Sequence, residues 1–264
     1  MGIAFALSTF QIMKNAIFVS LISTSLIFGV LQSASADQST DDAIVDATIE
    51  LARSQLGDLE RLDSIKSITY KGSLFYSSGD SGTIDLIYQK PMHQKLIAVI
   101  NDSKEVSALD DTEGWISYYK IGLDQSLGME IFDPARVLMM QAAVREAFGF
   151  YKRPTHRGGR VTYDGREKVK DVDCVVLIYH HGEGIGYIRY FDAATGRLMK
   201  TVDANGVEYY EEGEIMVEGV RFPKKLVTTF STAVGPQTME FTYSKITLDK
   251  KHDASIFELP SLVD

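Results

Sequence analysis

The feature that most constrains this fold is a hydrophobic pattern of period two, which starts at Ser67 and recurs through most of the remaining chain. Successive side chains of a strand point to opposite faces, so this pattern indicates strands with one buried face. Segments rich in turn-forming residues, such as 77–82, 101–103 and 192–196, separate the stretches at hairpin spacing. We therefore predict about eleven strands in one large antiparallel meander, a mainly β (α+β) fold.

One turn carries a sharper signal than the others. Asn205-Gly206 separates a predicted strand at Arg197–Asp203 from the next at Val207–Val217. Asn-Gly suits a two-residue type I′ turn, because both central residues of that turn need a positive φ. The pair predicts a tight β-hairpin.

Three segments depart from the alternation and are predicted to be helical. Two of them, 39–57 and 59–65, precede the first strand. The third begins at Asp133-Pro134, runs to Phe148 and is ended by Gly149, which is the usual placement of proline and glycine around a helix.

This third helix is apolar on nearly every side. Its polar residues form only a narrow strip, made of Arg136, Gln141, Arg145 and Glu146. A helix of this kind, inserted in the middle of a β-meander, is predicted to cover one face of the sheet.

The N-terminus is typical of an exported protein. Lys14 precedes an apolar run at 17–31, and Ala34-Ser35-Ala36 offers a small-x-small cleavage site, so residues 1–36 are predicted to be a secretory signal peptide. The apolar run is shorter than a membrane span of about 20 residues, although an uncleaved anchor is the alternative. Residues 1–12 are hypothesised to be an extension ahead of a start at Met13. Residues 37–264 are predicted to form a single domain.

Charge and cysteine content exclude several classes of protein. The formal net charge is −9, which argues against nucleic acid as a partner and against tight adhesion to an anionic bilayer. The single cysteine, Cys174, lies in an apolar strand pattern, so it is predicted to be a packed and inert thiol. A soluble periplasmic protein fits these features.

Signatures of catalysis and of cofactor binding are weak, and we predict neither an enzyme nor a cofactor. His180 and His181 are adjacent on a predicted strand, so they point to opposite faces and cannot easily share a metal ion. Gly182–Gly186 resembles a dinucleotide-binding loop but lies between two strands, so it is predicted to be a hairpin. Two acidic groups, at 110–113 and 211–214, are interpreted as solvated charges.

The order of these elements resembles the family of periplasmic outer-membrane lipoprotein carrier and sorting proteins (LolA/LolB-like). The resemblance covers roughly Ile44 to Pro260. It is carried by short stretches whose order together is the signal: 65–72, 88–91, 110–115, 163–174, 190–196, 219–223 and 246–260.

The resemblance implies an unclosed half-barrel whose concave side is apolar and covered by helices, and which holds a lipid or an acylated lipoprotein. A donor or acceptor protein of the inner or outer membrane is a further expected partner. The residues predicted to bind lipid in or near this groove are Tyr70, Leu74, Leu86, Tyr88, Leu96, Trp115, Met140, Val144 and Phe148. Ordinary core packing is the alternative for each of them.

One departure from the family pattern concerns a predicted gate residue. Carriers of this family often place an arginine before the proline that precedes the third strand, with an aromatic residue soon after it. This chain has Lys90 before Pro91, and then Gln94. Lysine keeps the positive charge but lacks the bidentate fork of arginine. Lys90 is therefore a gate candidate that would hold a carbonyl of the lid or a ligand head group.

Two other functions remain open at this stage. The same fold could act as a periplasmic sensor or interaction module that binds a membrane regulator. It could also carry a hydrolase site, which would need a polar cluster inside the groove.

Overall fold

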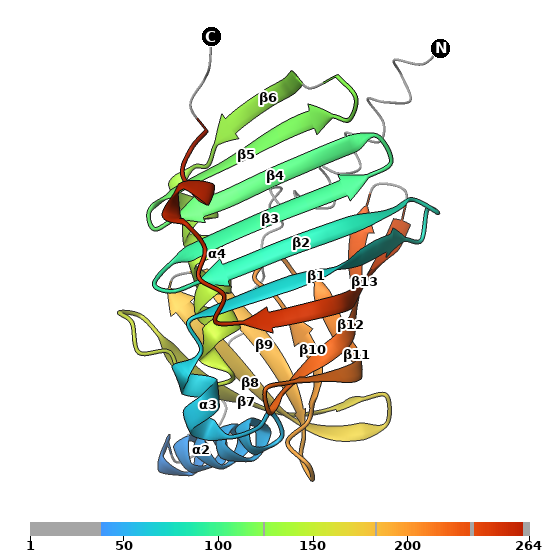
Figure 1. The fold of residues 1–264 in the computed structure, drawn as a ribbon. Coiled ribbons are helices and arrows are strands. Elements are labelled where there is room, and N and C mark those ends of the chain that lie inside the picture. The colour runs from blue at the N-terminus through green and yellow to red at the C-terminus, as the bar shows by residue number, and fades with distance from the viewer. Residues whose placement is uncertain (1–37, 124, 183, 233–234, 261–264) are drawn as a thin grey trace.

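A computed structural model of the protein describes residues 38–123, 125–182, 184–232 and 235–260. Within these ranges the chain forms one 13-stranded antiparallel sheet with helices α2 (Gln38–Ser54), α3 (Leu59–Ser64) and α4 (Pro134–Gly149), and a 3-10 helix, η1 (Ala254–Ile256) (Figure 1). The predicted signal peptide lies outside the described residues. No helix of the described ranges is both long and apolar enough to span a membrane.

The strands follow the chain in two runs that meet in the middle of the sheet. The first run is β1 (Ser67–Tyr76), β2 (Ser81–Gln89), β3 (His93–Ile100), β4 (Ser103–Asp110), β5 (Glu113–Lys120) and β6 (Gln125–Ile131). The second is β7 (Arg160–Val169), β8 (Val172–Gly182), β9 (Ile185–Asp192), β10 (Leu198–Val202), β11 (Glu208–Val217), β12 (Val220–Thr232) and β13 (Gly235–Leu248). The spatial order is β6-β5-β4-β3-β2-β1-β13-β12-β11-β10-β9-β8-β7.

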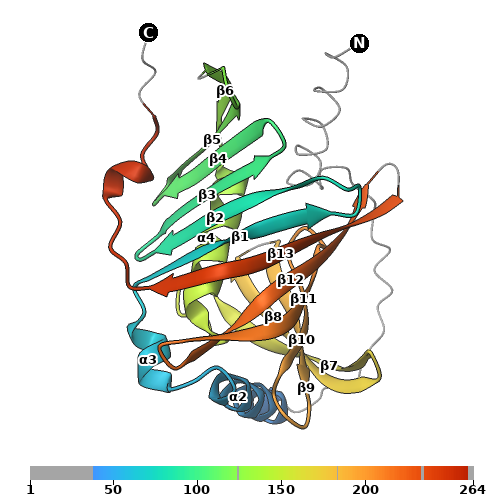
Figure 2. The same cartoon turned by 45° about the vertical axis from the view of Figure 1, so that its right-hand side comes forward.

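Helix α4 connects the two edges of this sheet. The chain leaves the sheet at β6, crosses as α4 and re-enters at β7, the opposite edge. Along its length α4 packs on β2 to β5, and through Glu146 it reaches His181 of β8 and Arg189 of β9. Five strands separate β2 from β9, so one helix can touch both only if the sheet curves around it (Figure 2).

The predicted fold class is confirmed, since the sheet is antiparallel and is not closed into a barrel. About eleven strands were predicted, and the two that the pattern does not mark are β6 and β7. These are the edge strands, where charged and glycine-interrupted sequences are tolerated because one side of the ladder has no neighbour.

The ends of α4 have the predicted chemistry with one difference. The Asp133 carboxylate accepts a hydrogen bond from the Arg136 backbone N–H at 2.8 Å, and Pro134 occupies the first turn. The helix continues through Gly149, and Phe150, not the glycine, takes the left-handed conformation at φ 44°. A residue of another helix stabilises the C-terminal end of α4. The buried Arg53 of α2 donates hydrogen bonds to the carbonyls of Gly149 and Phe150 at 3.1 and 2.9 Å.

The predicted type I′ turn at Asn205-Gly206 is wrong. Only Gly206 has a positive φ in this turn, at 75°. The Gly206 N–H donates to the carbonyl of Asp203 at 2.9 Å, and the Asp203 carboxylate accepts from the N–H groups of Asn205 and Val207. The aspartate side chain thus holds a three-residue loop, with glycine at its left-handed position.

Two apolar layers form, one on each face of the sheet. On the concave side, α2 and the end of α4 pack on strands β7 to β13 and β1, and the rest of α4 packs on β4 and β5. On the convex side, Cys174 is a buried free thiol in a cluster with Val176 and Tyr190, and burial raises its pKa. The interpretation of Cys174 as a packed thiol is confirmed.

Candidate functional site

The concave face beneath α4 is the candidate site. Strand register brings Tyr70, Leu86 and Leu96 into one row across β1, β2 and β3, so their side chains share a face. Leu74 and Leu96 pack in one cluster of this face with Phe230 of β12, and Tyr88 packs in another with α4. Alternation along each strand places these five predicted residues on the concave side.

The three predicted helix residues lie on α4, where it faces β4 and β5. Met140, Val144 and Phe148 pack with Leu109 and Ile116. Val144 is 1 % exposed and is closed core, whereas Met140 and Phe148 are half-buried.

Burial divides the predicted residues into two groups. Leu74 and Val144 are fully buried, so they serve packing. Leu86, Leu96 and Met140 remain half-buried although the sheet curves around them, and Leu138 of α4 is 51 % exposed. These half-exposed apolar side chains can contact an apolar ligand without opening the core.

Trp115 does not belong to this site. Its cross-strand partner is Ala108, and it packs with Ile97 on the convex face, where its indole N–H donates to the carbonyl of Phe257 at 3.0 Å. Trp115 was predicted to lie in or near the groove. It does not, because Ile116 and Tyr118 are the residues of β5 that point toward the concave side. The C-terminal segment covers the tryptophan, beside a pocket of about 390 Å³ that also contacts Lys95.

Five tyrosines that the sequence analysis did not select also line the concave side: Tyr151, Tyr179, Tyr187, Tyr209 and Tyr243. Burial raises the pKa of each, and that of Tyr70 as well. Some of their hydroxyls are satisfied internally, as Tyr179 donates to the Tyr151 carbonyl and Tyr209 to Asp203, both at 2.9 Å. For the four tyrosines that lie on strands, alternation was a usable signal, since each is in phase with inward-facing neighbours. Tyr151 follows α4 and lies on no strand, so the sequence offered no such signal for it.

A buried ionic cluster ties α4 to the second half of the sheet. The Glu146 carboxylate accepts hydrogen bonds from Arg189 and, at 2.5 Å, from His181, and His156 stacks on His181 with ring centroids 5.1 Å apart. Burial alone would raise the pKa of Glu146, but the charge of Arg189 and the hydrogen bonds outweigh it and lower the pKa. The sequence assigned Glu146 to the narrow polar strip of α4, and the structure turns this part of the strip toward His181 of β8 and Arg189 of β9.

The histidine pair diverges as predicted. His180 contacts Thr162 at 3.0 Å on β7, while His181 points inward to Glu146. Among the described residues, no group of three or more histidine, cysteine or acidic side chains is arranged to hold a metal ion.

Glu211 corrects a second expectation. It was interpreted as solvated, yet burial raises its pKa, opposed first by Arg221, whose Nη1 lies 3.8 Å from its carboxylate. Its neighbour Glu212 is exposed and pairs with Lys225 at 2.7 Å. The two adjacent acids lie on opposite faces of β11, as period two requires.

Lys90 contacts two elements that cover the concave face. Its ammonium lies 5.0 Å from the centre of the Phe148 ring of α4 and 3.4 Å from the carbonyl oxygen of Asp63 in α3. Burial lowers the pKa of Lys90, with Asp63 opposing the shift. Gln94 pairs with Tyr88 across β2 and β3, on the same face.

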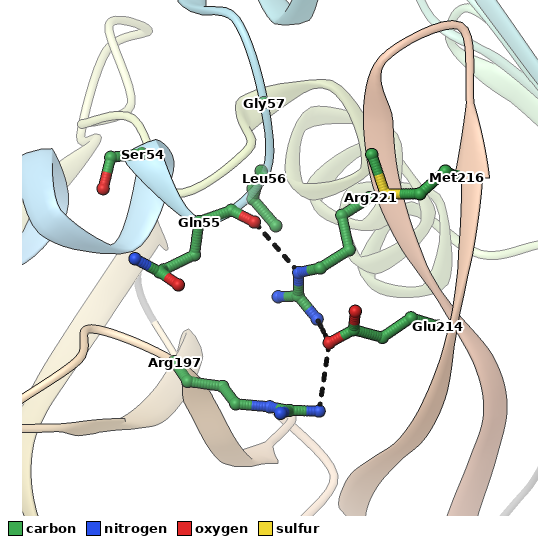
Figure 3. Close-up of a pocket in the computed structure, with 8 residues that line it drawn as sticks. All are labelled: Ser54, Gln55, Leu56, Gly57, Arg197, Glu214, Met216 and Arg221. Atoms are coloured by element: carbon green, nitrogen blue, oxygen red, sulfur yellow. Dashed lines mark hydrogen bonds and ion pairs between the residues drawn. The ribbon is translucent and has the colours of Figure 1, made fainter.

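A separate pocket of about 330 Å³ lies where the end of α2 meets β11 and β12 (Figure 3). The Arg221 Nε donates to the Gln55 carbonyl at 3.1 Å, and both Arg221 and Arg197 point to Glu214, at 3.7 and 3.3 Å. Each charge in this pocket has a partner of the opposite sign, so the pocket is interpreted as structural.

Comparison with known proteins supports the fold. No family model and no curated protein matches the chain. The LolA superfamily protein NE2245 from Nitrosomonas europaea is 11% identical, with a TM-score of 0.53 over 81% of this chain and 97% of that one.

Two further solved structures show weaker likeness over 81% of this chain and 97% of their own, each at 10% identity. They are a DUF1329 family protein from Desulfovibrio piger (TM-score 0.49) and a putative outer membrane lipoprotein-sorting protein domain from Vibrio parahaemolyticus (0.47). The resemblance inferred from the sequence is confirmed at the level of the fold, on the match to the LolA superfamily structure.

Proposed function

We propose that this protein is an exported, periplasmic carrier that shields the acyl chains of a lipid or lipoprotein against the concave face of its sheet. One observation supports this best. Apolar side chains of the concave face, Leu86 and Leu96 of the sheet and Met140 of α4, are half-buried where a closed core would bury them fully.

The energetics of such a site need no catalytic group. Removing an acyl chain from water contributes about 0.8 kcal/mol per methylene, so a chain of about fifteen methylenes contributes on the order of 12 kcal/mol before ordering costs. Met139 and Met140 on α4 suit variable chains, because the unbranched methionine side chain repacks easily.

The test is mass spectrometry of an organic extract from the mature protein, Asp37 to Asp264, purified from a periplasm without detergent. We expect a phospholipid or an acylated peptide at about one copy per protein. A protein that is empty, and that also fails to take up a fluorescent fatty acid, would contradict the proposal.

The gate role of Lys90 gives a kinetic prediction. Lys90→Ala removes a cation–π contact and a hydrogen bond that join the turn after β2 to α4 and α3, so a bound fluorescent fatty acid should dissociate about two- to fivefold faster. Stopped-flow dilution measures this rate. Lys66→Ala, at an exposed lysine of the same region, is the control and should not change it. Equal release from Lys90→Ala and the unmodified protein would exclude a gate.

A second candidate function is an interaction module for a membrane regulator. It is favoured by the edge strand β6, on which Leu127 and Ile131 are 53% and 70% exposed. Exposed edges of this kind accept a strand from another chain. A pull-down that returns one membrane protein, from a preparation that contains no lipid, would favour this function over the carrier.

A further inference from the structure

One charged side chain lies on the apolar part of the concave face. Glu105 is in β4, opposite Ala98 of β3 and Tyr118 of β5. Its alternation partners along β4 are Ser107 and Leu109, and Leu109 packs against α4. Glu105 is 1 % exposed, so its carboxyl group is enclosed on this face.

Part of this carboxyl group has no partner. Among the described residues, none donates a hydrogen bond to Glu105 Oε1. Burial raises the pKa of Glu105 to about 7, against the opposing charge of Arg136. A buried carboxylate oxygen without a donor destabilises a fold, because it has lost water and gained nothing in return. Folding stability does not explain why such a group is present, so another role for it has to be considered.

Another acid of this face, Glu146, behaves differently. Glu146 has two donors, Arg189 and His181, which account for its burial as part of the structure. Glu105 lies in the same curved sheet, yet one of its oxygens points at no donor of the described chain. The missing donor is therefore expected from a ligand.

Charged and titratable groups surround Glu105 from every neighbouring element. Arg136 is in the first turn of α4, with its guanidinium 3.6 Å from the centre of the Phe132 ring. Glu130 of β6 lies opposite Ile116, on the inward face of the sheet, and also acts on Arg136. Tyr118 and Tyr76 are the other titratable groups near Glu105. Burial is the main cause that raises the pKa of each to about 12, and the negative charge of Glu105 is the second. This end of the concave face thus combines a hydrogen-bond acceptor, the Glu105 carboxylate, with a cation, the Arg136 guanidinium.

We infer that Glu105 binds the head group of the acyl ligand through a hydrogen-bond donor, an ammonium or a hydroxyl, so that the protein selects lipids by head group as well as by chain. The inference rests on the proposed carrier function and names its ligand class. A phosphoethanolamine head group fits both charges, with its ammonium for Glu105 and its phosphate for Arg136. Phosphatidylcholine has the same charges and no N–H donor, which makes it the matched comparison.

The test measures affinity by displacement of a fluorescent fatty acid from the mature protein. The competitors are dioleoyl phosphatidylethanolamine, phosphatidylglycerol and phosphatidylcholine. At pH 8 we expect phosphatidylethanolamine to bind about tenfold more tightly than phosphatidylcholine, as one charge-assisted hydrogen bond provides. A preference for phosphatidylglycerol over phosphatidylcholine would assign a hydroxyl donor and also supports the inference.

Two variants and one change of pH complete the design. Glu105→Gln should bring the ratio between phosphatidylethanolamine and phosphatidylcholine below about twofold, while Glu113→Gln, at the exposed start of β5, should keep it. In the unmodified protein, lowering the pH from 8 to 6 should shrink the ratio as Glu105 takes up a proton. The pH experiment uses only the unmodified protein, so its result does not depend on whether a variant folds. Fatty-acid binding without any head-group preference would overturn the inference and leave the carrier function standing. No fatty-acid binding at all would overturn both.

Discussion

Glu146→Ala should lower the free energy of unfolding at pH 7 by about 3–5 kcal/mol, measured by urea denaturation followed by circular dichroism. The variant removes the carboxylate that Arg189 and His181 share, and Arg189 is only 7 % exposed. A buried guanidinium without its anion has neither water nor an ion partner. The rings of Tyr151 and Tyr179, 5.0 and 4.5 Å from it, compensate for only part of that loss.

A double variant separates this cause from simple loss of packing. Glu146→Ala combined with Arg189→Met removes both charges, so it should be more stable than Glu146→Ala alone. Because the pKa of Glu146 is lowered in the fold, its contribution is complete at neutral pH and is lost as the pH falls below its ordinary value of 4.5. A loss of less than about 1 kcal/mol in the single variant would show that the cluster does not hold α4.

Glu105→Gln should have the opposite effect, and only at higher pH. The pKa of Glu105 is raised from 4.5 to about 7 in the fold, so the folded state holds its proton more tightly than the unfolded state does. The unmodified protein therefore loses stability as the pH rises from about 4.5 to about 7, by roughly 3 kcal/mol in total. The glutamine does not titrate and avoids this loss.

The measurement is the difference in unfolding free energy between Glu105→Gln and the unmodified protein at pH 4.5 and at pH 8. This difference should shift by about 3 kcal/mol in favour of the variant. Comparing two proteins at each pH cancels the titration of the other acids, Glu146 among them. A difference that stays constant between the two pH values would show that Glu105 is solvated when the protein is folded. A protein that keeps a destabilising carboxylate fits a group retained for binding.

Most of the strands and the start of the central helix follow from local chemistry, and the sequence is sufficient for them. Period two assigns Tyr70 and Leu74 to one face of β1, and Leu86 and Tyr88 to one face of β2, because alternation is a property of each strand alone. The N-cap at Asp133 likewise needs only its own turn, since its carboxylate reaches an N–H three residues away. The edge strands β6 and β7 escape this reasoning, because an edge does not require a clean alternation.

Which face is the inner one could be decided only by tertiary structure. In β5, Trp115 and Tyr119 share one face and Ile116 and Tyr118 the other, and both series are apolar enough to be buried. The structure buries both, one under α4 and one under the C-terminal segment. Likewise, the rotation of α4 about its own axis could not be predicted, because apolar residues lie on nearly every side of it. The sequence therefore did not show that Glu146 faces Arg189.

The sequence by itself determined most of the strands, which residues of one strand share a face and where α4 begins. Only the tertiary structure decided that Trp115 packs on the convex face, and that Glu146 and Glu211 point toward arginines on the concave side. It alone shows that one oxygen of Glu105 has no donor among the described residues. The physical reason is that periodicity is set by the backbone within one element. Inside and outside are set by the curvature of thirteen paired strands, to which residues far apart in the chain contribute together.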